Sequence, residues 1–146
     1  MNASSQRGAP WNDFTIAVEL DQPYDAVVAA VRDSFGDQGF GVLTEIDVAA
    51  TLKKKLGVEV APQVILGACN PALAHRGLAV EPGLGLLLPC NVVVRVDDAG
   101  RTLVSVLDPD VMVGVTGRTE LEPVAAEATT RLRAALDTLV AGGAER

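Results

Sequence analysis

Hydrophobic and polar positions follow two different periods in the first part of the chain. Residues 14–20 alternate apolar side chains with small or polar ones, which predicts a strand with one buried face. In residues 26–35 the apolar positions recur every three or four residues, as in an amphipathic helix. A second strand is predicted over residues 40–46 and a short helix over residues 48–56, with Gly57 as the C-cap that ends it.

The middle of the chain holds a mostly apolar run followed by a helix start. The run covers residues 63–69 and suits a buried central strand. Asn70 and Pro71 then provide a cap and a first-turn proline, so a helix is predicted over residues 72–80. Residues 86–91 fit neither period, and their structure is left open.

The last part of the chain predicts a β-hairpin and the most regular helix of the sequence. Residues 92–96 and 101–107 are strand-like and flank a short polar loop. A short irregular or helical piece is expected over residues 110–115, and apolar positions at helical spacing run through residues 120–140. The order β-α-β-α-β-α-β-β-α favours an α+β fold (mixed α/β class), with a single mixed β-sheet and helices packed mainly on one face.

The composition agrees with one folded domain. The chain has 146 residues, of which 49% are hydrophobic, so it can bury a core and does not resemble a disordered chain. We expect a single domain over residues 11–140. Residues 1–10 and 141–146 are predicted to be flexible N-terminal and C-terminal tails, because they are polar or rich in glycine.

The charge balance excludes two classes of partner. With 12 basic and 19 acidic residues the net charge is −7, and aromatic residues make up only 3%. Nucleic-acid phosphates and anionic lipids both attract basic surfaces, so we expect neither a nucleic-acid nor a membrane partner. No apolar run is long enough to cross a bilayer, and the first ten residues do not form a signal peptide. The expected location is therefore the cytoplasm.

Two short segments carry the residues most suited to chemistry. Cys69-Asn70 and Cys90-Asn91 each follow an apolar run, at junctions between regular elements where ligand sites are often built. His75, the sole histidine, falls in the second turn of the helix that Asn70 caps. The candidate ligand-binding residues are therefore Cys69, Asn70, His75, Cys90 and Asn91.

Several roles are open to these residues. Cys69, His75 and Cys90 with one water match a catalytic zinc pattern, so zinc or another transition metal is a possible cofactor. Cys69 is the candidate catalytic nucleophile of a thiol-dependent enzyme or redox protein, because a helix N-terminus stabilises a thiolate. A disulfide between the two cysteines requires close Cα atoms. Alternatively both cysteines are inert and buried in a structural interaction domain, and His75 is a surface residue.

The chain also resembles a known family. The resemblance is carried by residues 52–57, 65–71, 73–76 and 81–94, and it continues through Asp108-Pro109 and Met112. These segments resemble the family called domain of unknown function 302 over nearly the whole chain. The resemblance implies a small mixed α/β fold and often a homodimer, and it implies no activity. Members often carry an aromatic residue where this chain has Gln63, so a pocket lined by that position would be altered here.

These observations lead to one functional expectation and leave the question of catalysis open. We expect a cytoplasmic homodimer that binds or senses a small molecule or a metal around Cys69, His75 and Cys90. The thiol-dependent enzyme and the structural interaction domain remain the alternatives.

Overall fold

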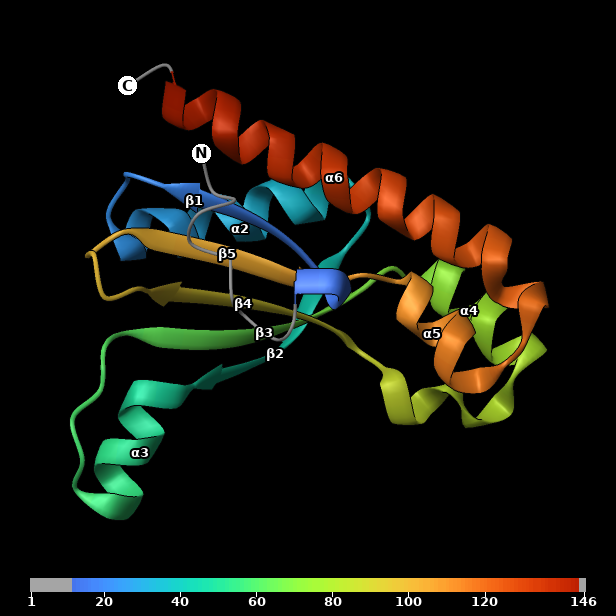
Figure 1. The fold of residues 1–146 in the computed structure, drawn as a ribbon, viewed down its shortest axis with the longest axis horizontal. Helices are drawn as coiled ribbons and strands as arrows, with labels where there is room; N and C mark the ends of the chain where they lie inside the picture. The colour runs from blue at the N-terminus through green and yellow to red at the C-terminus, as the bar shows by residue number, and fades with distance from the viewer. Residues whose placement is uncertain (1–11, 145–146) are drawn as a thin grey trace.

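Five strands and several helices make up residues 12–144, the part of the chain that the computed structural model describes (Figure 1). The strands are β1 (Thr15–Leu20), β2 (Gly41–Asp47), β3 (Gln63–Cys69), β4 (Cys90–Val96) and β5 (Thr102–Leu107). The α-helices are α2 (Tyr24–Asp37), α3 (Val48–Leu56), α4 (Pro71–Val80), α5 (Asp110–Thr116) and α6 (Glu122–Ala144). Three short 3-10 helices are η1 (Asn12–Phe14), η2 (Pro82–Leu87) and η3 (Thr119–Leu121).

The predicted fold class is confirmed, and so is the order of the predicted elements. The expected caps explain why several boundaries agree closely. Asn70 accepts a hydrogen bond from the amide of Leu73 at 3.1 Å and starts α4. Gly57 adopts a left-handed conformation with φ of 71° and ends α3. The open segment 86–91 becomes the end of η2 followed by the start of β4.

All the strands belong to one sheet, in the order β1-β5-β4-β3-β2. Every neighbouring pair is antiparallel, whereas the expected mixed sheet would contain parallel pairs as well. The reason is that α3 and α4 extend from the ends of the sheet between strands that are themselves neighbours (Figure 1). Only α2 crosses the sheet, and it joins the two edge strands β1 and β2.

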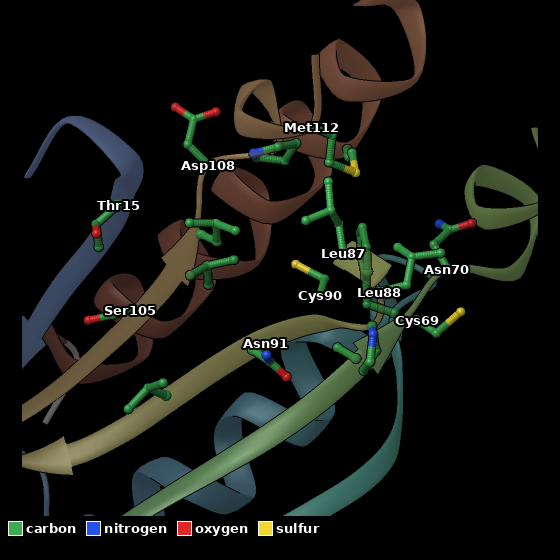
Figure 2. A pocket seen from close by; sticks show the side chains of 18 of the residues that line it. Thr15, Cys69, Asn70, Leu87, Leu88, Cys90, Asn91, Ser105, Asp108 and Met112 are labelled. Atoms are coloured by element: carbon green, nitrogen blue, oxygen red, sulfur yellow. The ribbon is translucent and has the colours of Figure 1, made fainter. Parts of the chain in front are cut away.

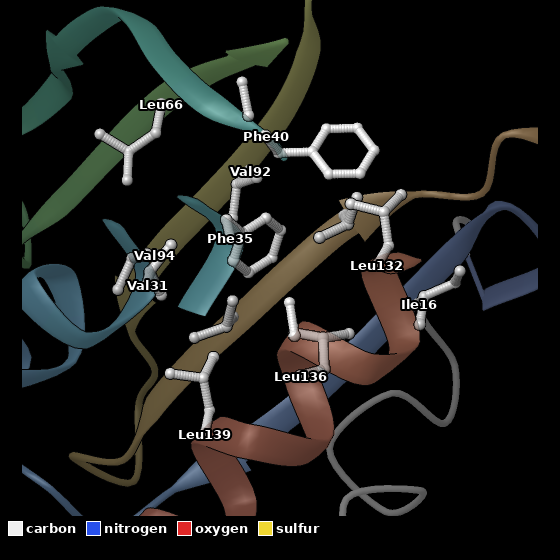
Figure 3. Close-up of a cluster of buried hydrophobic side chains, with 14 of the residues drawn as sticks. Ile16, Val31, Phe35, Phe40, Leu66, Val92, Val94, Leu132, Leu136 and Leu139 are labelled. Atoms are coloured by element: carbon white, nitrogen blue, oxygen red, sulfur yellow. The ribbon is translucent and has the colours of Figure 1, made fainter. Parts of the chain in front are cut away.

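The main core lies between one face of the sheet and helices α2 and α6 (Figures 1 and 3). Even-numbered residues of β1, β3, β4 and β5 point to this face, and most of them are buried, as the period of two requires. The edge strand β2 has a bulge between Val42 and Thr44 and contributes no buried residue. The largest fully buried side chains of the core include Val31 and Phe35 of α2, Leu66 of β3, Val92 and Val94 of β4, and Leu132 and Leu136 of α6.

The opposite face of the sheet carries odd-numbered residues and has neither α2 nor α6 over it (Figure 1). Asn91, Val93 and Arg95 of β4 lie on this face, opposite Gly67, Ile65 and Gln63 of β3 in that order. We call this surface the second face of the sheet.

The two predicted tails, residues 1–10 and 141–146, lie at or beyond the ends of the described region. Residues 1–10, the predicted N-terminal tail, lie outside the described residues. At the other end α6 continues to Ala144, so the predicted boundary at residue 140 falls inside a helix. The two glycines there do not end the helix. Within residues 12–144 no helix is long and apolar enough to cross a membrane.

Candidate functional site

A pocket of about 850 Å³ lies where β3 ends and β4 begins. Side chains from β3, β4, β5, α4, η2, α5 and α6 reach it, so segments far apart in the sequence share one cavity (Figure 2). Most of the described residues that line it are apolar. Those at the ends of the strands and on the surrounding helices include Leu73, Leu84, Leu87, Leu88, Met112 and Val124.

The pocket continues from these helices along the second face of the sheet. Asn91, Val93 and Arg95 of β4 line it, and so do Leu103 and Ser105 of β5. In the sheet Ser105 lies opposite Val93, and Leu103 lies opposite Arg95, so these side chains share one surface. The cavity is therefore elongated, with an apolar end among the helices and a more polar end on the sheet.

Cys69 and Cys90 both line the pocket but face different surroundings. Cys69 is the last residue of β3, and Cys90 is the first residue of β4 and lies opposite Ala68. Successive residues of a strand point to opposite faces, so the two side chains diverge (Figure 2). Both are free thiols. Burial, and secondarily the nearby Cys69, raise the pKa of Cys90 to about 11, so this thiol stays protonated even at moderately alkaline pH.

Asn70 and Asn91 both line the pocket, and each has a different structural setting. Asn70 is half-buried and caps α4. A Cβ atom on Gly39, which has a positive φ of 84°, would lie 2.9 Å from the Asn70 side-chain nitrogen. Asn91 is exposed on β4, opposite Gly67. It is therefore a strand residue whose amide is directed toward the cavity (Figure 2).

His75 is the one candidate that the structure does not bring to the pocket. It lies on the exposed side of α4, away from Leu73 and Gly77, which are buried. Among residues 12–144 no group of three or more histidine, cysteine, aspartate or glutamate side chains is placed to hold a metal ion. The metal site expected on Cys69, His75 and Cys90 therefore stays a prediction without structural support in this part of the chain.

The pocket also contains polar residues that were not among the predicted binding residues. Arg95, Ser105 and Asp108 line it, together with Gln63, the position noted above as a departure from the family pattern. The carboxylate of Asp108 accepts a hydrogen bond from the Asp110 amide at 2.9 Å and so stabilises the turn that precedes α5. Strand alternation places Arg95 on the same face as Asn91, but only the fold shows that this face lines a cavity.

The chain is similar to one known family over most of its length. The family model described as domain of unknown function DUF302 matches residues 16–139. The chain is also similar to a solved structure of an uncharacterised conserved DUF302 protein from Bacillus stearothermophilus, with 33% sequence identity and a TM-score of 0.79. That match covers 85% of this chain and 96% of the other. No match was found among the curated proteins.

Proposed function

Because the chain belongs to the DUF302 family, whose description names no activity, we propose from its pocket that it is a small-molecule binding protein. The ligand is held at the ends of β3 and β4, between the second face of the sheet and the surrounding helices. This places the predicted binding residues Cys69, Asn70, Cys90 and Asn91 around the ligand, and it leaves His75 out.

The observation that carries this proposal is the cavity itself. Its volume of about 850 Å³ falls in the range of roughly 300–1,000 Å³ that is common for small-molecule sites. Such sites are mainly apolar, with a few polar groups that orient the ligand. Here the leucines and Met112 supply the apolar wall, and Asn91, Ser105 and Arg95 supply the polar groups.

An uncharged fluorescent probe, Nile red, tests whether the pocket binds an apolar molecule. Leu87 lines the pocket, and Leu86 next to it is 93% exposed and does not. We expect Leu87→Trp to weaken Nile red binding by about tenfold or more, because an indole fills part of the cavity. Leu86→Trp is the matched control and keeps the wild-type affinity.

Fluorescence titration measures the affinities, and thermal unfolding shows that both variants are folded. No saturable binding to the wild-type protein, or equal affinities for both variants, would contradict the proposal.

We also propose that the protein is a homodimer, with β2 and the segment after it at the interface. β2 is an edge strand whose outer side has no strand partner among the described residues. Leu43 and Leu56 are 69% and 70% exposed. Ile46, Val58 and Val60 are also exposed, so apolar side chains are concentrated in this region. A second copy related by a two-fold axis would pair the two edges and cover these side chains.

A further inference from the structure

We propose that the ligand is an elongated amphipathic carboxylate, with its anionic group at Arg95 and its apolar chain directed toward Leu84 and Met112. This inference rests on the proposed function, because it assigns a ligand class to the same pocket. The assignment comes from the charged side chains of the cavity and from where they lie.

Arg95 is the cation in the pocket lining, and it lacks a carboxylate partner within residues 12–144. Its half-buried position makes this notable, because a guanidinium removed from water is normally paired with an anion. The arginines that do have acidic partners among the described residues are Arg32, Arg76, Arg101, Arg118 and Arg131.

The surroundings of Arg95 suit a carboxylate. Gln63 lies opposite Arg95 on β3 and lines the same pocket, so its side-chain amide is a second donor at this end. On the other side Leu103 separates Arg95 from Glu19 of β1 in the sheet register. The Glu19 carboxylate is already paired with Arg101, at 3.3 Å. A ligand carboxylate at Arg95 therefore gains charge-assisted hydrogen bonds.

The other charged residue of the lining fixes the direction of the ligand. Asp108 lines the pocket directly after the end of β5. Along the chain it is five residues beyond Leu103, which lies opposite Arg95 in the sheet. At the strand rise of about 3.4 Å per residue, the two charged ends lie roughly 17 Å apart. A carboxylate is attracted by Arg95 and repelled by Asp108, so the head group lies on the sheet. The apolar chain then reaches the cavity among η2, α5 and α6, where Leu84, Leu87 and Met112 lie.

Three ligands with the same tail test the assignment: dodecanoate, 1-dodecanol and dodecylammonium. In calorimetric titrations of the wild-type protein we expect dodecanoate to bind most tightly and dodecylammonium least tightly. Arg95→Gln weakens dodecanoate binding by about tenfold or more, because a charge-assisted hydrogen bond is lost. The same substitution changes 1-dodecanol binding by less than about twofold. Arg95→Lys retains the charge and recovers part of the dodecanoate affinity.

Arg133→Gln is the matched control, because Arg133 is exposed on α6, outside the pocket lining, and it also has no acidic partner among the described residues. It leaves the affinity for dodecanoate unchanged. Equal loss of dodecanoate and 1-dodecanol in Arg95→Gln would overturn the inference, as would a wild-type protein that binds Nile red but not dodecanoate. A wild-type protein that does not bind Nile red would overturn the proposed function itself. The failure of the ligand assignment and the failure of the proposed function therefore give different results.

Discussion

The two Cys-Asn pairs are alike in the sequence, but the fold gives each residue different surroundings. Cys90 points toward the core, whereas Asn91 faces the pocket from the second face of the sheet. Cys69 ends a strand, and Asn70 has its carbonyl oxygen engaged as a helix cap. A repeated local sequence thus places four side chains around one pocket without giving them one shared role.

The raised pKa of Cys90 predicts a loss of stability at alkaline pH. In the unfolded chain this thiol ionises near pH 9.0, but in the folded protein it stays neutral up to about pH 11. The unfolded state therefore releases its proton first, and the free energy of unfolding falls as the pH rises between these values. The fall that Cys90 contributes is on the order of 2–3 kcal/mol.

Urea unfolding at a series of pH values measures this contribution. Other groups titrate in the same range, so the test is the difference between variants. Cys90→Ala should show a shallower decline than the wild type between pH 9 and 11. Cys69→Ala should keep most of the wild-type decline, because burial is the larger cause of the raised pKa of Cys90. Equal slopes for wild type and Cys90→Ala would show that burial does not hold this thiol neutral.

Among the elements, α3 and α4 begin with the same kind of cap and differ in what they bury. The Asp47 carboxylate accepts a hydrogen bond from the Ala50 amide at 2.8 Å at the start of α3, as Asn70 does at the start of α4. No residue of α3 is buried, and this helix projects away from the sheet (Figure 1). In α4, Leu73 and Gly77 are buried. The stability of α4 is therefore coupled to the core, and that of α3 is not.

This difference predicts unequal effects when each cap is removed. Asn70→Ala should lower the free energy of unfolding by about 1 kcal/mol, because α4 unfolds together with the core. Asp47→Ala should change it much less and instead speed amide hydrogen exchange within α3. Urea unfolding and exchange measured by NMR test the two effects. Asn70→Ser keeps a capping oxygen and is the control, and equal destabilisation by both alanine variants would contradict the expectation.

The elements with local signals were the ones that the sequence predicted. Caps and periodicity mark α3, β3 and α4, and the polar loop marks the β4–β5 hairpin. η2 was not predicted, although Pro82 stands in its first turn and the Glu81 carboxylate accepts a hydrogen bond from the Gly83 amide at 2.8 Å. Its residues follow no helical or strand period, and it packs against a neighbouring helix. A Cβ atom on Gly77 would lie only 2.6 Å from the Leu84 side chain, so α4 and η2 pack closely at this glycine. The sequence shows both residues but not their contact.

At the scale of the whole molecule, the homodimer predicts a mass twice that of the 15.1 kDa chain. Leu56→Glu should shift the protein to a single chain, because it places a charge in the proposed apolar interface. Analytical ultracentrifugation measures the mass. Leu86→Glu is the control, since Leu86 is even more exposed than Leu56 but lies on η2, outside the proposed interface. A wild-type protein that sediments as one chain would contradict the dimer.

The pocket was only partly predictable for a physical reason. Cys69, Asn70, Cys90 and Asn91 flank the ends of adjacent strands, so local structure was enough to bring them near one another. His75 is two residues from Leu73, and two residues turn an α-helix by more than half a turn, so a buried Leu73 places His75 outside. Arg95 lies on the second face of the sheet, and it lines the pocket only because neither α2 nor α6 covers that face. Which face the helices cover depends on the complete topology, so the sequence pattern around Arg95 could not show it.

The crossover of α2 also determines when the fold can be completed during synthesis. β1 is made before the other strands of this sheet, but its partner in the sheet is β5, with Leu20 lying opposite Thr102. A nascent chain therefore carries β1 without its strand partner while about eighty further residues are made. α6 supplies much of the cover for the core, and it is made only after all five of these strands. Such non-local pairing slows folding. Until β5 and α6 are made, the edge of β1 and the apolar surface of the core stay exposed, so the incomplete chain is most prone to aggregate, and most in need of a chaperone, at this stage.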